Sequence, residues 1–280
     1  MAASDGLFAL RKFRQDKKML NGMLIDLRRQ KSIQTRIIAA EFFAHILQLE
    51  KGEVYDRHIA EMLVSGRLVR KLVRCLQFDE NDIYLKRFSA EALSALFLCG
   101  DQTDKHLVGD MGGRAALIDM IHPFNDPQLR TTAIIGTLHN IRNCEQCRQA
   151  LREGDLLDRL AAILLHELNL ESVDVDYERQ RRLQLVLDLI EALIDDSPES
   201  TLRVFGYATL RKDIIARINR DDNEMCVMLR GFLVKSVKWC HERRFLKEEG
   251  LEEALEKLKS VGTNEMSAEV ERTLALVRDA

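Results

Sequence analysis

Apolar residues recur at steps of three and four along nearly the whole chain, and runs that alternate apolar and polar positions are missing. This spacing places the apolar side chains on one face of a helix, so it predicts an all-α protein. Only three of the 280 residues are proline, and few breaks therefore interrupt the helical pattern. Long helical chains of this kind are often built from repeats.

Two sequence markers recur with one period. The first marker is a short helical segment that recurs along the chain. The second residue of each copy lies 40 to 52 positions after that of the copy before it, and these residues are Phe43, Leu93, Leu138, Ile190, Val234 and Leu274. The second is a glycine before an apolar helix, at Gly66, Gly113, Gly154, Gly206 and Gly250, with separations of 41 to 52 residues. Together they predict a unit made of a short helix, a tight turn in which glycine takes a positive φ, a second helix, a polar loop and a long third helix.

These markers also predict how the chain is divided. Residues 1–31 are expected to form an N-terminal capping helix or helices, and residues 32–280 the repeats. The approximate units are 32–78, 79–125, 126–170, 171–220 and 221–262, with a partial C-terminal cap at 263–280. Each unit exposes apolar faces that only its neighbours can cover, so both ends need caps.

Two adjoining segments carry a family resemblance. "KHLVGDMGGRAALIDMI" at 105–121, followed by "NDPQLRTTAIIGTLHNI" at 125–141, resembles the short first helix, glycine turn, second helix and long third helix of the armadillo family. The resemblance implies a right-handed α-solenoid of about five armadillo-like three-helix repeats, whose third helices line a concave groove. HEAT-like helix pairs are the nearest structural alternative.

The resemblance also implies a protein-binding groove. Armadillo proteins that bind extended peptides carry a recurring asparagine on their third helices, and Asn140 matches that position. The equivalent positions do not repeat it, so a single asparagine does not form a peptide-gripping row. The residues expected in the groove, at this position and one turn earlier, are Asn140, His45, Ser236, Glu41, Glu91, Asp188 and Phe232.

Three of these positions are acidic. Equivalent helix positions stack in register along a solenoid, so Glu41, Glu91 and Asp188 are predicted to share one face. Such a face would attract another protein that presents a basic helix or loop. The alternative is that the two glutamates are exposed helix carboxylates paired with Arg36 and Arg87.

Residues 1–31 allow two interpretations. They carry eight Lys or Arg against three Asp, together with a broken apolar stripe formed by Phe8, Phe13, Leu20, Met23, Leu24 and Leu27. One interpretation is a basic amphipathic arm for a membrane surface or an acidic partner. We favour the other, a capping helix, because the apolar stripe is needed to cover the first repeat.

Candidate chemistry is sparse. The only closely spaced cysteines, Cys144 and Cys147, lack the second pair of a metal site and the preceding strand of a redox motif. We interpret them as packed thiols that carry neither metal nor a functional disulfide. No catalytic arrangement of side chains stands out, so we expect neither enzyme activity nor a cofactor.

A formal net charge of -3 gives no global attraction to nucleic acid, and no apolar run approaches the roughly 20 residues of a membrane span. The expected protein is soluble and cytoplasmic, and is either a monomer or a subunit of a hetero-complex. Its predicted function is that of a non-catalytic protein–protein interaction scaffold or adaptor that uses the groove and edges. The alternative is a structural subunit of a large intracellular assembly, such as a cytoskeletal or ciliary complex.

Overall fold

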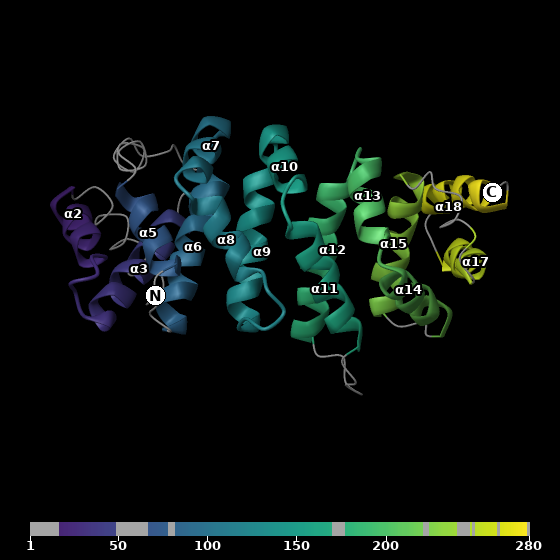
Figure 1. The fold of residues 1–280 in the computed structure, drawn as a ribbon, viewed down its shortest axis with the longest axis horizontal. Helices are drawn as coiled ribbons and strands as arrows, with labels where there is room; N and C mark the ends of the chain where they lie inside the picture. Colours follow the sequence, from purple (N-terminus) through teal and green to yellow (C-terminus); the bar gives the residue numbers. More distant parts are fainter. Residues whose placement is uncertain are drawn as a thin grey trace, which may run out of the picture. The chain divides into compact units, whose positions relative to one another are not determined.

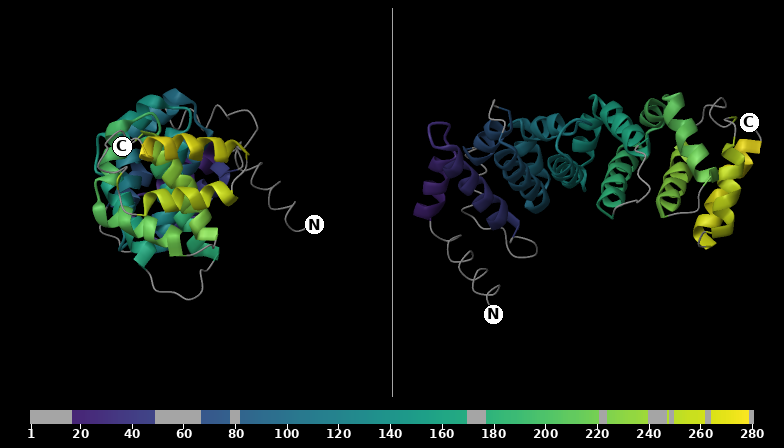
Figure 2. Two further views of the ribbon diagram at one scale, coloured as in Figure 1. Left: turned by 90° about the vertical axis from the view of Figure 1, so that its right-hand side faces the viewer. Right: turned by 90° about the horizontal axis from the view of Figure 1, so that it is seen from below.

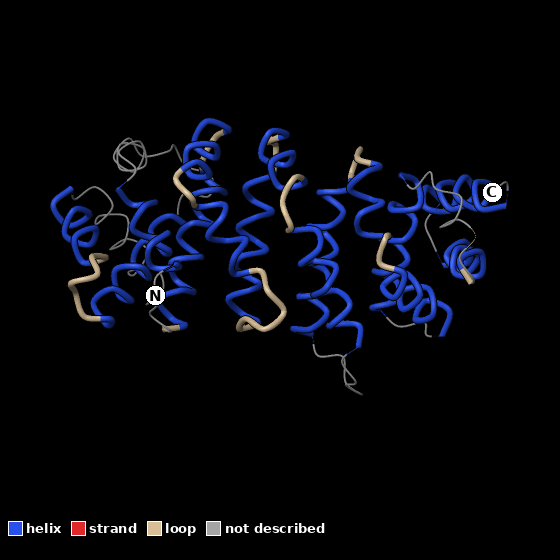
Figure 3. Tube along the Cα trace, viewed as in Figure 1, coloured by secondary structure: helices blue, strands red, loops and turns tan. Residues whose placement is uncertain are grey.

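The structure, a computed structural model, describes residues 17–48, 67–77, 82–169, 177–220, 224–239, 247, 250–261 and 264–278. All regular structure in these ranges is α-helical and none is strand (Figure 3), which confirms the all-α prediction. Phe8, Phe13 and Gly66 lie outside the described ranges. The chain divides into two compact units, Met1–Arg148 and Gln149–Ala280.

The helices of the first unit pack on one another (Figure 1). They are α2 (Lys17–Asp26), α3 (Ile33–Gln48), α5 (Arg67–Gln77), α6 (Ile83–Cys99), α7 (Gln102–Asp110), α8 (Gly113–Met120), α9 (Pro127–Ile141) and α10 (Glu145–Arg152), the last of which runs across the boundary between the units. Helix α6 packs between α3 and α9, so these three helices lie side by side in the order α3, α6, α9. Six successive residues, 92–97, are buried on it, so every side of that part of the helix is covered by a neighbour.

The second unit continues the same kind of packing. Its helices are α11 (Leu156–Asn169), α12 (Tyr177–Ile194), α13 (Pro198–Phe205), α14 (Ala208–Arg220), α15 (Glu224–Trp239), α17 (Leu251–Val261) and α18 (Asn264–Arg278). Helix α12 contacts α11 and α15, and α17 lies beside α18 (Figure 2). The rings of Phe205 and Phe232 stack with centroids 5.8 Å apart, which joins α13 to α15.

Local sequence signals explain where several helices begin. Asp82 and Asp101 accept backbone hydrogen bonds at the starts of α6 and α7, and Asp104 completes a capping box at α7. Asp126 precedes Pro127 at the start of α9. Proline suits the first turn of a helix, because the N–H that it lacks would have no partner there.

The predicted glycine turns are only partly present. Gly250 has φ +82°, and Gly112, the neighbour of the predicted Gly113, has φ +90°. Gly206 instead adopts right-handed helical geometry with φ −59°, and neither Gly113 nor Gly154 has a positive φ, so the expectation is wrong at these three positions. The N–H of Gly206 bonds to Leu202 and Val204, and the last turn of α13 therefore continues through the glycine.

Nine successive helices in the described part of the chain form three groups of three, and in each group the first helix is short and the third is long. The long helices α9, α12 and α15 have 15, 18 and 16 residues, and each group begins with a helix of eight or nine residues, α7, α10 or α13. None of the helices in the described ranges is both long and apolar enough to cross a membrane.

Candidate functional site

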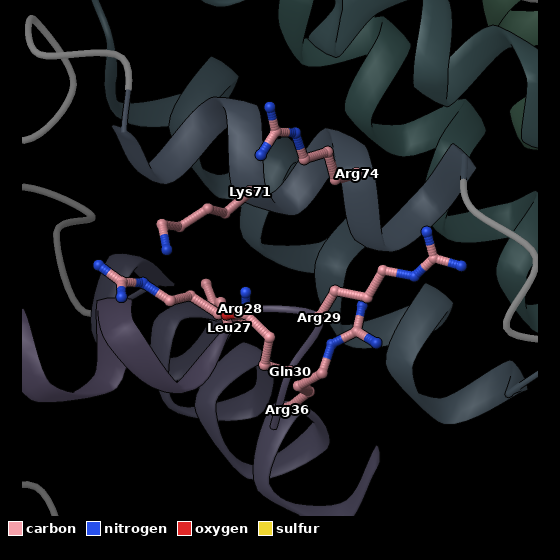
Figure 4. Close-up of a pocket in the computed structure, with 7 residues that line it drawn as sticks. All are labelled: Leu27, Arg28, Arg29, Gln30, Arg36, Lys71 and Arg74. Atoms are coloured by element: carbon pink, nitrogen blue, oxygen red, sulfur yellow. The ribbon is translucent and has the colours of Figure 1, made fainter. Parts of the chain in front are cut away.

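Cationic side chains surround a cavity of about 450 Å³ in the first unit (Figure 4). The residues that line it, called the basic pocket below, are Leu27, Arg28, Arg29, Gln30, Arg36, Lys71 and Arg74. Five of these seven are arginine or lysine, and no acidic residue of the described ranges lines the cavity. The pocket therefore concentrates positive charge in a chain whose net charge is negative.

The turn after α2 provides one wall of the pocket. It is tightened by backbone hydrogen bonds from Arg28 to Ile25 (3.0 Å) and from Lys31 to Arg28 (2.9 Å). Leu27 is buried, which anchors the turn to the core, while Arg28 and Arg29 stay exposed. The hydroxyl of Ser32 then accepts the backbone N–H of Thr35 at 3.2 Å and starts α3, which brings Arg36 to the pocket.

Helix α5 provides the opposite wall, and its sequence, RLVRKLVRCLQ, explains why. The apolar positions, which include Leu68, Leu72 and Leu76, are all buried. The remaining face carries mostly cations, at Arg67, Arg70, Lys71 and Arg74. Because the apolar face must pack against the core, the helix has to direct these cations outward. Lys71 and Arg74, one turn apart, reach the pocket.

The cations in the pocket repel one another. Partial burial and then the positive charge of Arg28 lower the pKa of Lys71, and Arg74 and Arg67 act in the same direction. Figure 4 shows Lys71 pointing toward Arg28 from the opposite wall, whereas Arg29 directs its guanidinium away from them. An anion placed between Lys71 and Arg28 would relieve this repulsion.

Arg36 forms the buried part of the pocket. Its side chain is 4% exposed, and its Nη2 lies 3.5 Å from Sγ of Cys75 on α5. This contact joins α3 to α5, so the buried guanidinium is held by both helices. A guanidinium suits an anionic ligand, because a carboxylate or phosphate can accept two parallel hydrogen bonds from it.

The chemistry of the lining residues indicates binding. A cavity of this volume lies within the usual range of ligand pockets. Its lining offers cationic donors, one amide and one leucine, and it contains neither a hydroxyl nor a thiol nucleophile beside a general base. The pocket is therefore suited to hold an anionic group.

The acidic residues predicted in the groove have neighbours of their own. Oε1 of Glu91 lies 3.1 Å from Nε of Arg87, as the alternative interpretation expected. Oε1 of Glu41 lies 3.8 Å from Nε2 of His45, and the pairing of Glu41 with Arg36 stays a prediction. Asp188 accepts a hydrogen bond of 2.6 Å from Gln184. An acidic face shared by these residues stays a prediction.

The other groove residues are buried. Asn140, Ser236 and Phe232 are each 0% exposed. Ser236 donates a hydrogen bond of 2.7 Å to the carbonyl of Phe232 within α15. A partner could contact these side chains only if the surrounding helices moved apart, so packing accounts for them in this structure. Of the seven predicted positions, only His45 is exposed, and the three acids are half-buried.

Cys144 and Cys147 form a disulfide, with their Cα atoms 5.3 Å apart. The expectation of two unlinked packed thiols is therefore wrong. Cys144 directly precedes the first residue of α10 and Cys147 lies within its first turn, which brings the two Cα atoms into the range that a disulfide spans. Nε2 of His106, on α7, lies 3.6 Å from Sγ of Cys144.

The sequence contained partial signals for the basic pocket. Arg28 and Arg29 belong to the basic segment 1–31, for which an acidic partner was the alternative interpretation. Lys71 and Arg74 lie in "SGRLVRKLVRCL", which served only as a repeat marker. The signal that could have found them is the row of cations at steps of three and four on an otherwise apolar helix.

The chain matches no protein-family model, and no curated protein has a significantly similar sequence.

Proposed function

We propose that the protein is a non-catalytic interaction protein that binds an anionic segment of a partner protein in the basic pocket. The observation that carries this proposal is the cavity of about 450 Å³ lined by five cations and, among the described residues, by no carboxylate. The shared chemistry of the ligand is a carboxylate or phosphate group on a side chain. This differs from the basic partner expected from the sequence, because the side chains that line the pocket are mostly cationic.

A protein segment fits the pocket better than a nucleic acid does. Nucleic-acid binding uses an extended row of cations and often aromatic platforms for the bases. Among the described residues, those that line the pocket include no aromatic ring. Cations on two facing walls suit the capture of an anionic side chain.

The pocket would belong to an armadillo-like α-solenoid. The contacts between successive long helices of the first unit support this architecture. Sγ of Cys99 donates to the carbonyl of Leu47 across 52 residues, and Ser94 contacts His139 across 45. Within the second unit, Arg203 contacts Asp158, also across 45 residues. These separations match the period of the two sequence markers, as expected when each unit packs only on its neighbours.

A non-catalytic role also agrees with the one Ser–His contact in the described ranges. Oγ of Ser94 lies 3.1 Å from Nδ1 of His139, but Ser94 is 6% exposed and sits between α6 and α9. Nδ1 is also 3.3 Å from the carbonyl of Ser94. The serine has no open surface on which a substrate could reach its hydroxyl, so the contact joins two helices.

Fluorescence polarisation of the full chain with three labelled peptides tests the proposal. The peptides share one sequence and carry phosphoserine, glutamate or serine at the central position. We expect the anionic peptides to bind more tightly than the serine peptide, and binding to weaken as salt is added. The double variant Arg28→Glu with Lys71→Glu should weaken binding by about tenfold or more, which corresponds to about 1.4 kcal/mol.

The matched control is Arg70→Glu, which changes an exposed cation of the same helix that does not line the pocket. It should leave peptide binding close to that of the parent. If the anionic peptides bind no better than the serine peptide, or if Arg70→Glu weakens binding as much as the double variant, the proposed function is wrong. A preference for phosphoserine over glutamate would identify a phosphorylated partner.

A second candidate function is a structural subunit of a large intracellular assembly. Exposed isoleucines on the first two described helices, Ile25, Ile33 and Ile38, favour it, because embedded subunits present apolar side chains to their neighbours. Size-exclusion chromatography with light scattering distinguishes the two. An adaptor should elute as a monomer, whereas an embedded subunit should self-associate when isolated.

A further inference from the structure

Three potential metal ligands from two helices converge in the first unit. Nε2 of His106 and the sulfur atoms of Cys144 and Cys147 all lie within 4.8 Å of one another. Both cysteines are buried and the histidine is half-buried. No other His, Cys, Asp or Glu of the described ranges joins this group. The sequence did not reveal it, because His106 lies 38 residues before Cys144.

The convergence is fixed by a row of contacts along one face of α7. Gln102 donates a hydrogen bond of 2.7 Å to the carbonyl of Asn143, and Nζ of Lys105 donates one of 2.5 Å to the carbonyl of Arg142. His106, the next residue on that face, then meets Cys144. Three positions of one helix face thus contact three consecutive residues of the turn between α9 and α10.

The conformation of the turn between α9 and α10 determines the position of Cys144. Asn143 has φ +58°, a left-handed conformation that asparagine tolerates better than most residues. This reversal ends α9 and places Cys144 directly before α10. The backbone N–H of Cys147 lies 3.3 Å from Sγ of Cys144 and points to it as a donor. Such a bond, together with the positive end of the helix, stabilises a thiolate at this position.

We propose that, once the disulfide is reduced, His106, Cys144 and Cys147 bind a thiophilic divalent metal ion of the zinc class. Reduction by an external thiol adds two electrons and two protons to the disulfide and gives two protein thiols, while two molecules of the external thiol are oxidised to their own disulfide. Metal binding then releases both thiol protons and forms two metal–sulfur bonds and one metal–nitrogen bond. The site provides three protein ligands, and the fourth position of a tetrahedral zinc ion is left for water or for a ligand atom of a partner.

The distances suit this chemistry. Zinc binds sulfur at about 2.3 Å and histidine nitrogen at about 2.0 to 2.1 Å, so tetrahedral ligand atoms are separated by about 3.3 to 3.9 Å. The distance of 3.6 Å between His106 Nε2 and Cys144 Sγ already lies in that range. The two sulfurs need only separate from each other after reduction, which requires a side-chain movement within one helical turn.

Cobalt binding to the full chain tests the site. The protein is reduced without oxygen by a phosphine, which passes two electrons to the disulfide and is oxidised to the phosphine oxide with oxygen from water. Cobalt(II) is then added, since its visible absorption reports tetrahedral sulfur coordination. We expect one cobalt per reduced chain, displaced by zinc, and none bound to the oxidised chain. Cys144→Ser and Cys147→Ser should each abolish the tetrahedral spectrum.

His106→Ala should weaken cobalt binding by about tenfold or more. Because His106 is only half-buried, this variant should fold even if the cysteine variants do not. The matched controls are Cys99→Ser and His122→Ala, which change residues outside the cluster and should leave the spectrum and the affinity unchanged. Absence of tetrahedral cobalt in the reduced parent, or equal binding by His106→Ala and the parent, would overturn the proposal and leave a structural disulfide only.

Discussion

Nε of Arg114 donates a hydrogen bond of 3.1 Å to Oδ1 of Asn140 and so joins α8 to α9. Asn140 is 0% exposed. Burial lowers the pKa of Arg114, and the negative charge of Asp110 acts in the opposite direction. A partly buried guanidinium needs an acceptor, because an unpaired donor away from water is costly. The amide of Asn140 supplies this acceptor, which explains an asparagine among apolar helix positions.

Asn140→Ala should therefore destabilise the protein. The substitution removes the acceptor from Arg114, so the free energy of unfolding should fall by about 1 to 3 kcal/mol. Urea denaturation followed by circular dichroism measures the change. In the double variant with Arg114→Met, the loss should be smaller than the sum of the two single losses. Strict additivity would show that the two side chains do not depend on each other.

Gly136 lies where α9 approaches α6 and α8 most closely. A Cβ at this position would come within 2.7 Å of Cδ1 of Leu117 and 3.1 Å of Cβ of Ser94. Gly136→Ala should thus destabilise the protein by about 1 to 3 kcal/mol through overpacking, although alanine is the better helix former. The melting temperature of the variant checks this.

The matched control for that prediction is Gly22→Ala. Gly22 also lies within a helix, but a Cβ there would meet nothing within 4 Å. Without a steric penalty, the gain in helix propensity should leave the melting temperature unchanged or slightly higher. If both variants lose stability equally, the close approach at Gly136 is not the cause.

Much of the fold follows from short-range pattern. The steps of three and four in segments such as 83–99 are repeated often enough to identify helices, and Asp126 with Pro127 marks the start of one of them. These signals lie within one helical turn of the feature they specify. They can be read without knowing which other helix is adjacent.

The site residues depend on contacts between helices, and sequence spacing does not encode those. Asn140 was predicted as a groove residue, yet its partner Arg114 is 26 residues earlier. The pair Cys144 and Cys147 was noticed, but without His106 it lacked a third ligand. The pocket likewise combines the turn after α2 with one face of α5. In each case a residue on a second helix, distant in the sequence, completes the interaction or the site.

Leu24→Ala tests the capping role predicted for residues 1–31. Leu20, Leu24 and Leu27 are all at most 5% exposed, and α2 packs on α3. Removing the Leu24 side chain should leave a cavity and lower the free energy of unfolding by about 2 to 5 kcal/mol. Ile25→Ala, on the exposed side of the same helix, should change it by less than about 0.5 kcal/mol. Equal effects of the two variants in urea denaturation would contradict packing through this apolar stripe.

Asp158 connects three elements of the second unit, and its stabilising effect should depend on pH. Its Oδ1 accepts hydrogen bonds from Nε of Arg203 (3.1 Å) and from the hydroxyl of Tyr207 (2.9 Å). Arg203 also donates to the carbonyl of Gly154 at 2.6 Å, so the guanidinium joins α13 to the turn before α11. Burial alone would raise the pKa of Asp158, but the hydrogen bonds from Arg203 and Tyr207 outweigh it and lower the pKa.

A carboxyl whose pKa is lower in the folded state stabilises the protein when it is ionised. The contribution of Asp158 should therefore be complete above its ordinary pKa of 3.8 and should be lost as the pH falls below that value through the lower folded pKa. Melting temperatures from neutral to acidic pH test this: Asp158→Asn should destabilise the protein at neutral pH, and the difference from the parent should shrink as the solution is acidified.

Asp155→Asn is the control, since Asp155 is exposed and pairs with Arg159 within one helical turn at 2.8 Å. Such a pair contributes about 0.5 kcal/mol or less, so its removal should have a small effect throughout. A constant difference between Asp158→Asn and the parent across the acidic range would show that the ionised carboxylate is not what joins these elements.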